Sequence, residues 1–227
     1  MNFSDREKEI LYKFLTMIKI SGLSRLSSME DLWKVTDNKT KLLIKKILQI
    51  DPAKFGFNGE KISENPIPND MVKIDDSQYI PEGENSLDPY SYLPKPVFES
   101  FNKMNCAFIK AFPDRKLVVG SGYRSPAYQI ATLIYILVNN YNFDISQTLK
   151  RVAMPQYSQH CSVSETAIDI MNVGGEPTDE HPEEFKNSVE YDWLTKNAKQ
   201  FGFYESYPPN NPYGIVWEPW HWQYRIS

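Results

Sequence analysis

Residues 51–90 restrict the fold of this 227-residue chain more than any other stretch. They hold five prolines and three glycines, which interrupt helices and sheet ladders. We therefore expect a linker or irregular loop over 51–90. It would separate an N-terminal helical region at 1–50 from a larger domain at 91–227.

Three helices are predicted within residues 1–50. Ser4 and Glu7 form a capping-box pattern at the start of the first helix. A second helix begins near Ser27, with Glu30 in the third helical position, and a third runs from about Asn38. The third helix is expected to bury one face that comprises Leu42, Leu43, Ile47 and Ile50.

The region after residue 90 mixes helical and strand patterns. Val97, Phe101 and Phe108 recur at helical spacing, and "KLVVGSGYRS" reads as a buried strand that enters a glycine turn. Ser125 is a suitable N-cap for a following helix, which places Arg124 just before a helix N-terminus. Together with the strand-like "TAIDIM" and the C-terminal segment, this predicts an α+β fold of helices on a small antiparallel sheet.

The C-terminal segment "GIVWEPWHWQYRI" is aromatic and strand-like, but Pro219 cannot donate to a ladder. In a regular strand, residues 218 and 221 face opposite sides, so Glu218 and His221 converge only if the chain kinks at Pro219. The tryptophans of the segment, Trp217, Trp220 and Trp222, would then wall a dry site. The plainer interpretation of the C-terminal segment is an aromatic core strand with a hydrogen-bonded histidine.

Composition excludes several classes of function. The net charge is about −4 and there is no run of five Lys or Arg, so we expect no nucleic-acid partner. No apolar stretch approaches 18 residues, so no transmembrane segment is predicted. The N-terminus lacks a signal-peptide pattern. The protein would be cytoplasmic if that end is native, and periplasmic or in the cell envelope if a signal was removed.

A metal site is predicted from two distant stretches. His160 precedes the strand that carries Asp169 among small and apolar neighbours, where a carboxylate needs a partner or a metal. His160, Asp169 and His221 make a typical catalytic zinc set with one position left open. Glu218 would act beside it as a general base rather than a ligand.

Three blocks in order, "SGYRSPAYQ", "SQHCSVSETAID" and "EPWHWQY", carry a family resemblance over roughly residues 90–227. They resemble the zinc D-alanyl-D-alanine carboxypeptidases and dipeptidases of cell-wall metabolism and vancomycin resistance, distant relatives of the lysostaphin-type and hedgehog folds. The resemblance implies one zinc ion bound by His160, Asp169 and His221, with Glu218 as the catalytic glutamate. Arg124 would contact substrate and support catalysis. Gln129 and Ser158 match family positions and would contact substrate or support the residues that do, and their plainer interpretation is a structural role.

One departure from the family pattern concerns the spacing of the first two ligands. The family has six residues and a midway glycine between histidine and aspartate, whereas eight separate His160 from Asp169 here. Val163 and Ser164 stand where that glycine is expected. We expect the two extra residues to be absorbed in a bulge or widened loop, which leaves both ligand directions intact.

The function implied is that of a zinc metallopeptidase that hydrolyses D-amino-acid-containing peptides of peptidoglycan, or a D-Ala-D-Ala-ending precursor. Carboxypeptidase, dipeptidase and endopeptidase action remain open, as does the oligomeric state. Two other interpretations are a catalytically impaired module that binds peptidoglycan or a partner, and an iron(II) facial-triad oxygenase. Cys161 is expected to be a packed thiol, and His181 receives no role.

Overall fold

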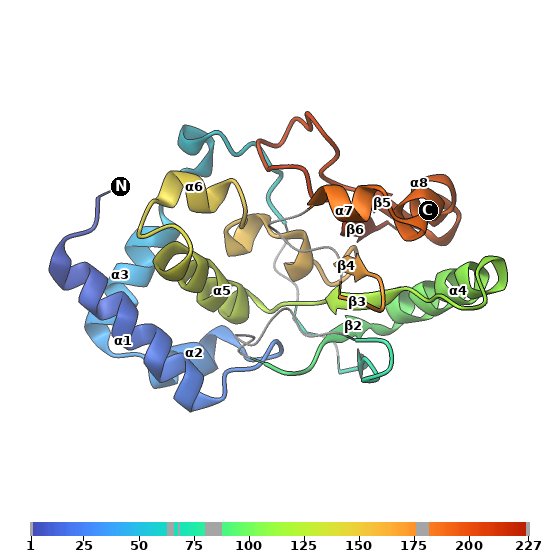
Figure 1. Ribbon diagram of the computed structural model, residues 1–227. Helices are drawn as coiled ribbons and strands as arrows, with labels where there is room; N and C mark the ends of the chain where they lie inside the picture. Colours follow the sequence, from blue (N-terminus) through green and yellow to red (C-terminus); the bar gives the residue numbers. More distant parts are fainter. Residues whose placement is uncertain (1, 63–65, 68, 80–87, 176–181, 226–227) are drawn as a thin grey trace.

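The computed structural model describes residues 2–62, 66–67, 69–79, 88–175 and 182–225, so His181 lies outside the described residues. Figure 1 shows the helices in two groups on either side of a small sheet. The α-helices are α1 (Asp5–Ser21), α2 (Met29–Val35), α3 (Asn38–Leu48), α4 (Lys95–Ala111), α5 (Pro126–Asn139), α6 (Ile145–Leu149), α7 (Pro182–Lys186) and α8 (Val189–Asn197). The short 3-10 helices are η1 (Pro52–Phe55), η2 (Pro155–Tyr157), η3 (Gln159–Cys161) and η4 (Ala198–Phe201).

The strands form two antiparallel sheets. Strands β1 (Met71–Lys73) and β2 (Tyr92–Pro94) pair with each other. The larger sheet has the order β3-β4-β6-β5. Its strands are β3 (Val118–Ser121), β4 (Ala167–Met171), β5 (Phe203–Glu205) and β6 (His221–Tyr224). The predicted α+β class with a small antiparallel sheet is confirmed.

The N-terminal helices begin where local capping chemistry places them. Ser4 and Glu7 form the predicted capping box of α1. The box of α2 is made by Ser28 and Asp31, one residue later than predicted. In α3 the buried face includes Leu43, Ile44 and Ile47, whereas Leu42 is 69% exposed, so its predicted burial is wrong.

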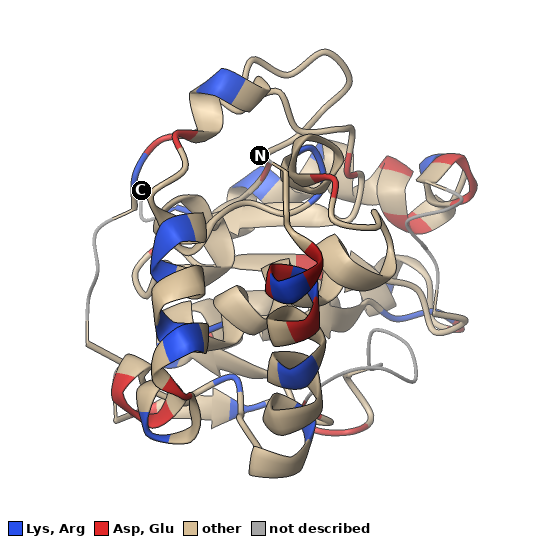
Figure 2. Ribbon diagram, turned by 90° about the vertical axis from the view of Figure 1, so that its left-hand side faces the viewer, with Lys and Arg blue, Asp and Glu red and all other residues tan. Residues whose placement is uncertain are grey.

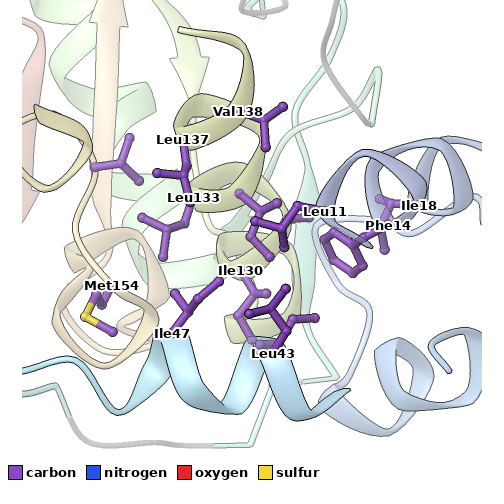
Figure 3. Close-up of a cluster of buried hydrophobic side chains, with 14 of the residues drawn as sticks. Leu11, Phe14, Ile18, Leu43, Ile47, Ile130, Leu133, Leu137, Val138 and Met154 are labelled. Carbon is purple, nitrogen blue, oxygen red and sulfur yellow. The ribbon is translucent and has the colours of Figure 1, made fainter. Parts of the chain in front are cut away.

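Helices α1 and α3 pack against α5 in one hydrophobic cluster (Figure 3). Side chains from the three helices interdigitate there, including Leu11, Phe14, Ile18, Leu43, Ile47, Ile130, Leu133 and Leu137. This burial holds the N-terminal helices against the rest of the chain. The domain division at residues 50 and 90 stays a prediction.

A second cluster fills the space between the larger sheet and the helices α4 and α8. Its buried members include Val97, Phe101, Met104, Phe108, Val119, Ile168, Ile170, Leu194, Phe203 and Trp222. Strand β3 lies in this second cluster and leads within four residues into α5, which belongs to the first. The connection at residues 122–125 therefore joins the two halves of the core.

Both acidic and basic residues occur on the side of the molecule that carries the N-terminal helices, with both signs on α1 and only lysines on α3 (Figure 2). An ion pair of this kind joins α1 to α3, where Lys46 Nζ lies 2.8 Å from a Glu7 carboxylate oxygen. Within the described ranges, none of the helices combines the length and apolar character needed to span a bilayer.

Candidate metal centre

His160, Asp169 and His221 come together from three elements. Each offers one ligand atom, and these atoms lie within 4.8 Å of one another. Asp169 on β4 is paired in register with His221 on β6, and His160 sits on η3. All three side chains are buried, near the end of β3 that leads into α5.

The ring of His160 is fixed by a backbone carbonyl. Its Nδ1 donates to the Gly122 carbonyl oxygen at 2.9 Å, so Nε2 carries the lone pair of the neutral ring. That Nε2 lies 3.2 Å from Asp169 Oδ2. Burial, with the charge of Arg124 nearby, lowers the pKa of His160 to about 4, which favours the neutral ring.

The ring of His221 is fixed in the opposite sense. Its Nε2 lies 3.0 Å from Gln159 Oε1, an oxygen that can only accept, so Nε2 carries the proton. Nδ1 then has the lone pair, and it lies 3.1 Å from Asp169 Oδ1. The two imidazole rings meet edge to face, with centroids 4.8 Å apart.

This arrangement fits a bound cation. In the neutral tautomers, a bare nitrogen of each histidine faces an oxygen of one ionised carboxylate, and two acceptors repel unless a proton or a cation lies between them. Burial opposes ionisation of Asp169. When the two rings are protonated instead, the pKa of Asp169 lies well below the usual range, because the charges and hydrogen bonds of His160 and His221 outweigh burial. Two nitrogens and one carboxylate are ligands that zinc accepts.

Glu218 reaches the same cluster through a turn. The His221 amide donates to the Glu218 carbonyl oxygen at 3.1 Å, which closes a turn over Pro219. The predicted kink is therefore present, and it brings Glu218 Oε2 to 3.8 Å from His221 Nδ1. The Glu218 side chain is also buried. Its predicted role as a general base stays a prediction.

Arg124 contacts the cluster from the β3–α5 connection. Its Nε and Nη2 donate to Ser121 Oγ at 3.0 and 2.8 Å, and Nη2 lies 3.4 Å from Asp169 Oδ2. Its backbone amide donates to the His160 carbonyl oxygen at 3.0 Å. Arg124 is thus tied to two members of the cluster.

Gln129 and Ser158, the other two predicted substrate contacts besides Arg124, are both buried. The Gln129 side-chain amide donates to the Ala153 carbonyl oxygen at 2.9 Å. The Ser158 carbonyl accepts from the Cys161 amide at 2.8 Å, inside the turn that carries His160. Contact of either residue with substrate stays a prediction.

The wall of the site differs from the sequence-based expectation. Trp222 follows His221 on β6 and therefore points to the opposite face, where it packs in the second hydrophobic cluster. Tyr207 contacts His221 instead, with ring centroids 4.7 Å apart. Burial, together with the charge of Glu218, raises the pKa of Tyr207, so its hydroxyl stays protonated beside the cluster.

The two extra residues between His160 and Asp169 are absorbed in bends over residues 163–165, as predicted. The loop is closed by Thr166 Oγ1, which donates to the Ser162 carbonyl, and by the Glu165 amide, which donates to Ser162 Oγ at 3.1 Å. Strand β4 starts directly afterwards, so the widened loop leaves the direction of Asp169 intact.

Sequence reasoning missed three residues of the site: Ser121, Gln159 and Tyr207. Ser121 and Gln159 lie inside the quoted blocks, three residues before Arg124 and one before His160, and so their position was available as a signal. Tyr207 has no such signal, because only the pairing of β5 with β6 brings the segment after β5 beside His221. Cys161 is buried, and burial raises the pKa of its thiol to about 12, which is typical of a packed cysteine.

Comparisons with known proteins agree with this architecture. The profile of the VanY family, described as D-alanyl-D-alanine carboxypeptidase, matches residues 90–227. The LdcB LD-carboxypeptidase, whose structure addresses peptidoglycan recognition, is 26% identical with a TM-score of 0.55, covering 74% of each chain. VanYB in complex with D-alanine-D-alanine is 23% identical with a TM-score of 0.49, covering 72% of this chain and 83% of that one.

A variant of the D,D-pentapeptidase VanY from a VanB-type resistance cassette, in complex with Zn(II), is 24% identical with a TM-score of 0.47. That match covers 72% of this chain and 85% of the other. No curated protein sequence matches the chain.

Proposed function

The chain belongs to the VanY family of D-alanyl-D-alanine carboxypeptidases, and from this premise we propose that it is a zinc-dependent peptidase of peptidoglycan peptides. It would remove the terminal D-alanine from a stem peptide or its precursor. The observation that supports zinc dependence is the pair of bare imidazole nitrogens, Nε2 of His160 and Nδ1 of His221, that face one carboxylate.

His160 through Nε2, His221 through Nδ1 and Asp169 through its carboxylate would hold the ion. When bound, zinc supplies Lewis-acid polarisation of the scissile carbonyl and makes a nearby water a stronger acid. The hydrogen bonds from His160 to Gly122 and from His221 to Gln159 keep the ligand nitrogens in the right tautomers beforehand.

Glu218 is the proposed proton carrier. Its carboxylate would accept a proton from water as the water oxygen bonds to the carbonyl carbon. The same proton would then pass to the nitrogen of the leaving amine as the carbon–nitrogen bond breaks. Glu218 Oε2 lies 3.8 Å from His221 Nδ1, and this closeness to the proposed ligands supports a role as proton carrier.

Arg124 is the proposed anchor for the carboxylate at the end of the peptide. A guanidinium binds a carboxylate through two parallel N–H donors. An enzyme that binds the C-terminal carboxylate of its substrate in this way favours removal of the last residue. The side chain is buried and held by Ser121, so little conformational freedom is lost when substrate binds.

The configuration of the residue before the scissile bond distinguishes two candidate activities. The likeness to the LdcB LD-carboxypeptidase favours cleavage after an L residue as a second candidate beside D,D-cleavage. The two activities share the same metal, base and anchor, because they differ only in how the pocket receives the side chain before the cleaved bond.

Release of D-alanine from two peptides tests the proposal. One peptide ends in D-Ala-D-Ala, and the other ends in D-Ala preceded by an L residue. We expect release from at least one of them, loss of release after treatment with a chelator, and recovery when zinc is returned. Binding of the peptides without turnover, in protein shown to hold zinc, would contradict the proposal and support the impaired binding module.

A further inference from the structure

Arg25 is a buried charged residue outside the region that the family profile matches, 90–227. It lies in the connection between α1 and α2, and only 1% of its surface is exposed. Arginine is rarely buried to this extent unless its guanidinium meets specific partners. Its contacts therefore indicate what the N-terminal region contributes.

The backbone of Arg25 is tied to the segment that leads into α5. Its carbonyl oxygen accepts from the Ser125 amide at 2.8 Å, next to Arg124 in the chain. Its own amide donates to Asp88 Oδ2 at 2.9 Å. The N-terminal region thus contacts the N-cap residue of α5, Ser125, directly after Arg124.

The side chain of Arg25 continues into the site. Nη1 donates to Ser121 Oγ at 2.8 Å, and the guanidinium lies over the Tyr128 ring, 5.1 Å from its centroid. The same Ser121 oxygen accepts from Nε and Nη2 of Arg124. Ser121 is in turn paired in register with Asp169 across β3 and β4. Two guanidinium groups therefore share one buried hydroxyl oxygen beside a proposed zinc ligand.

We propose that Arg25 is a positioning residue for this site: through Ser121 Oγ, it holds the Arg124 guanidinium in the place where it anchors the substrate carboxylate. This inference rests on the proposed function. The hydroxyl oxygen has two lone pairs, and Arg25 occupies one side of it, so the Arg124 donors are confined to the other side. The N-terminal region is then part of the substrate-binding apparatus.

Steady-state kinetics separate positioning from plain structural support. Arg25→Met keeps the bulk of the side chain but removes its charge and donors, so we expect KM for the cleaved peptide to rise about tenfold, with little change in kcat. Ser121→Ala should do the same. The double variant should be no worse than either single one, because both act through the same hydroxyl. Arg25→Lys restores a charged donor and should recover most of the loss.

Leu32→Ala is the matched control, because Leu32 is fully buried in α2 and belongs to the hydrophobic cluster rather than the site. It should lower the melting temperature and leave KM unchanged. Equal KM in Arg25→Met and in wild type would overturn the proposal, as would additive effects in the double variant. A KM rise in Leu32→Ala as large as that in Arg25→Met would also overturn it.

The Arg124 Nε–H signal in nitrogen-edited NMR of the metal-free protein gives a readout that needs no activity. The signal is identified by its loss in Arg124→Lys. We expect it to shift or broaden in Arg25→Met and to remain in Leu32→Ala. An unchanged Arg124 Nε–H signal in Arg25→Met would reject the positioning role, whether or not the wild type cleaves either peptide. Failure of the wild type to cleave either peptide would instead reject the proposed function.

Discussion

At the scale of single residues, the candidate centre depends on which nitrogen of each histidine carries a proton. Gly122 and Gln159 accept from His160 Nδ1 and His221 Nε2, so the remaining nitrogens both face Asp169. A ligand site in which outer hydrogen bonds set the tautomers is ready to bind a metal before the metal arrives.

Removal of the proposed base should separate catalysis from metal binding. Glu218→Ala deletes the carboxylate beside the cluster but leaves His160, Asp169 and His221 in place, so we expect kcat to fall about a hundredfold to ten-thousandfold. Zinc content, measured by elemental analysis, should stay at the wild-type value. A variant that keeps its activity would remove Glu218 from the mechanism.

Loss of the Gln159 oxygen should weaken metal binding. In Gln159→Leu, His221 Nε2–H has no acceptor in place of Oε1, so the other tautomer becomes accessible and zinc affinity should fall about 10–100-fold. Gln159→Glu keeps an acceptor and should stay near wild type. Gln147→Leu, the same change at an exposed position of α6, is the control for competition titrations with a chromophoric chelator. A zinc affinity equal to that of wild type in all three variants would contradict this role of the Gln159 oxygen.

At the scale of elements, short backbone features align the site. The turn at Pro219 brings Glu218 to His221, and the bends over residues 163–165 absorb the two extra residues before β4. Gly122 supplies the carbonyl for His160 while its own Cα lies against β2. Such contacts tolerate little change, because the atoms involved belong to the backbone of neighbouring strands.

Substitution of Gly122 tests this alignment. A Cβ at this position would lie 2.5 Å from the Tyr92 carbonyl oxygen, a backbone atom that cannot rotate away. We expect Gly122→Ala to lower the free energy of unfolding by about 1–3 kcal/mol and to weaken zinc binding, as the carbonyl partner of His160 shifts. Gly174→Ala, which meets only the Asn172 side chain, should stay within about 0.5 kcal/mol of wild type in urea unfolding.

Local sequence signals predicted where helices, strands and turns lie better than which side of an element each side chain faces. The N-caps Ser4 and Ser125, the strand at 167–171 and the turn at Pro219 were all readable, because each depends on nearby residues. Leu42 was misplaced because it lies about 100° around the helix from Leu43, outside the arc that faces α5. Trp222 was misplaced because strand alternation sends it away from the side of His221.

At the scale of the whole molecule, the site lies where two hydrophobic clusters meet. The N-terminal helices and α5 form one cluster, and the sheet with α4 and α8 forms the other. Contacts such as Arg25 with Ser121 and Gln159 with His221 join residues 96 and 62 positions apart, so no local pattern predicts them. The ligand residues were singled out by their types and local settings, and three ordered blocks that resemble a family pointed to the same set.

The stability of the metal-free protein should depend on pH through His160. Its pKa is about 4 in the folded state and near the ordinary value of 6.5 when unfolded, so the unfolded chain binds more protons between these values. Stability is therefore lost as the pH falls through this window. This one residue should cost about 2 kcal/mol between pH 7 and pH 5 in urea unfolding. His160→Gln, compared under the same conditions, should show a shallower fall, and an equally steep one would refute the assignment.

Calorimetric titration of chelator-stripped protein with zinc tests the central claim most directly. The wild-type chain should bind one zinc ion, whereas His160→Ala, Asp169→Ala and His221→Ala should each bind it at least about a hundredfold more weakly, because each loses one of three protein ligands. Zinc binding by wild type that survives unchanged in all three variants would contradict the account, and so would the absence of binding by folded wild type.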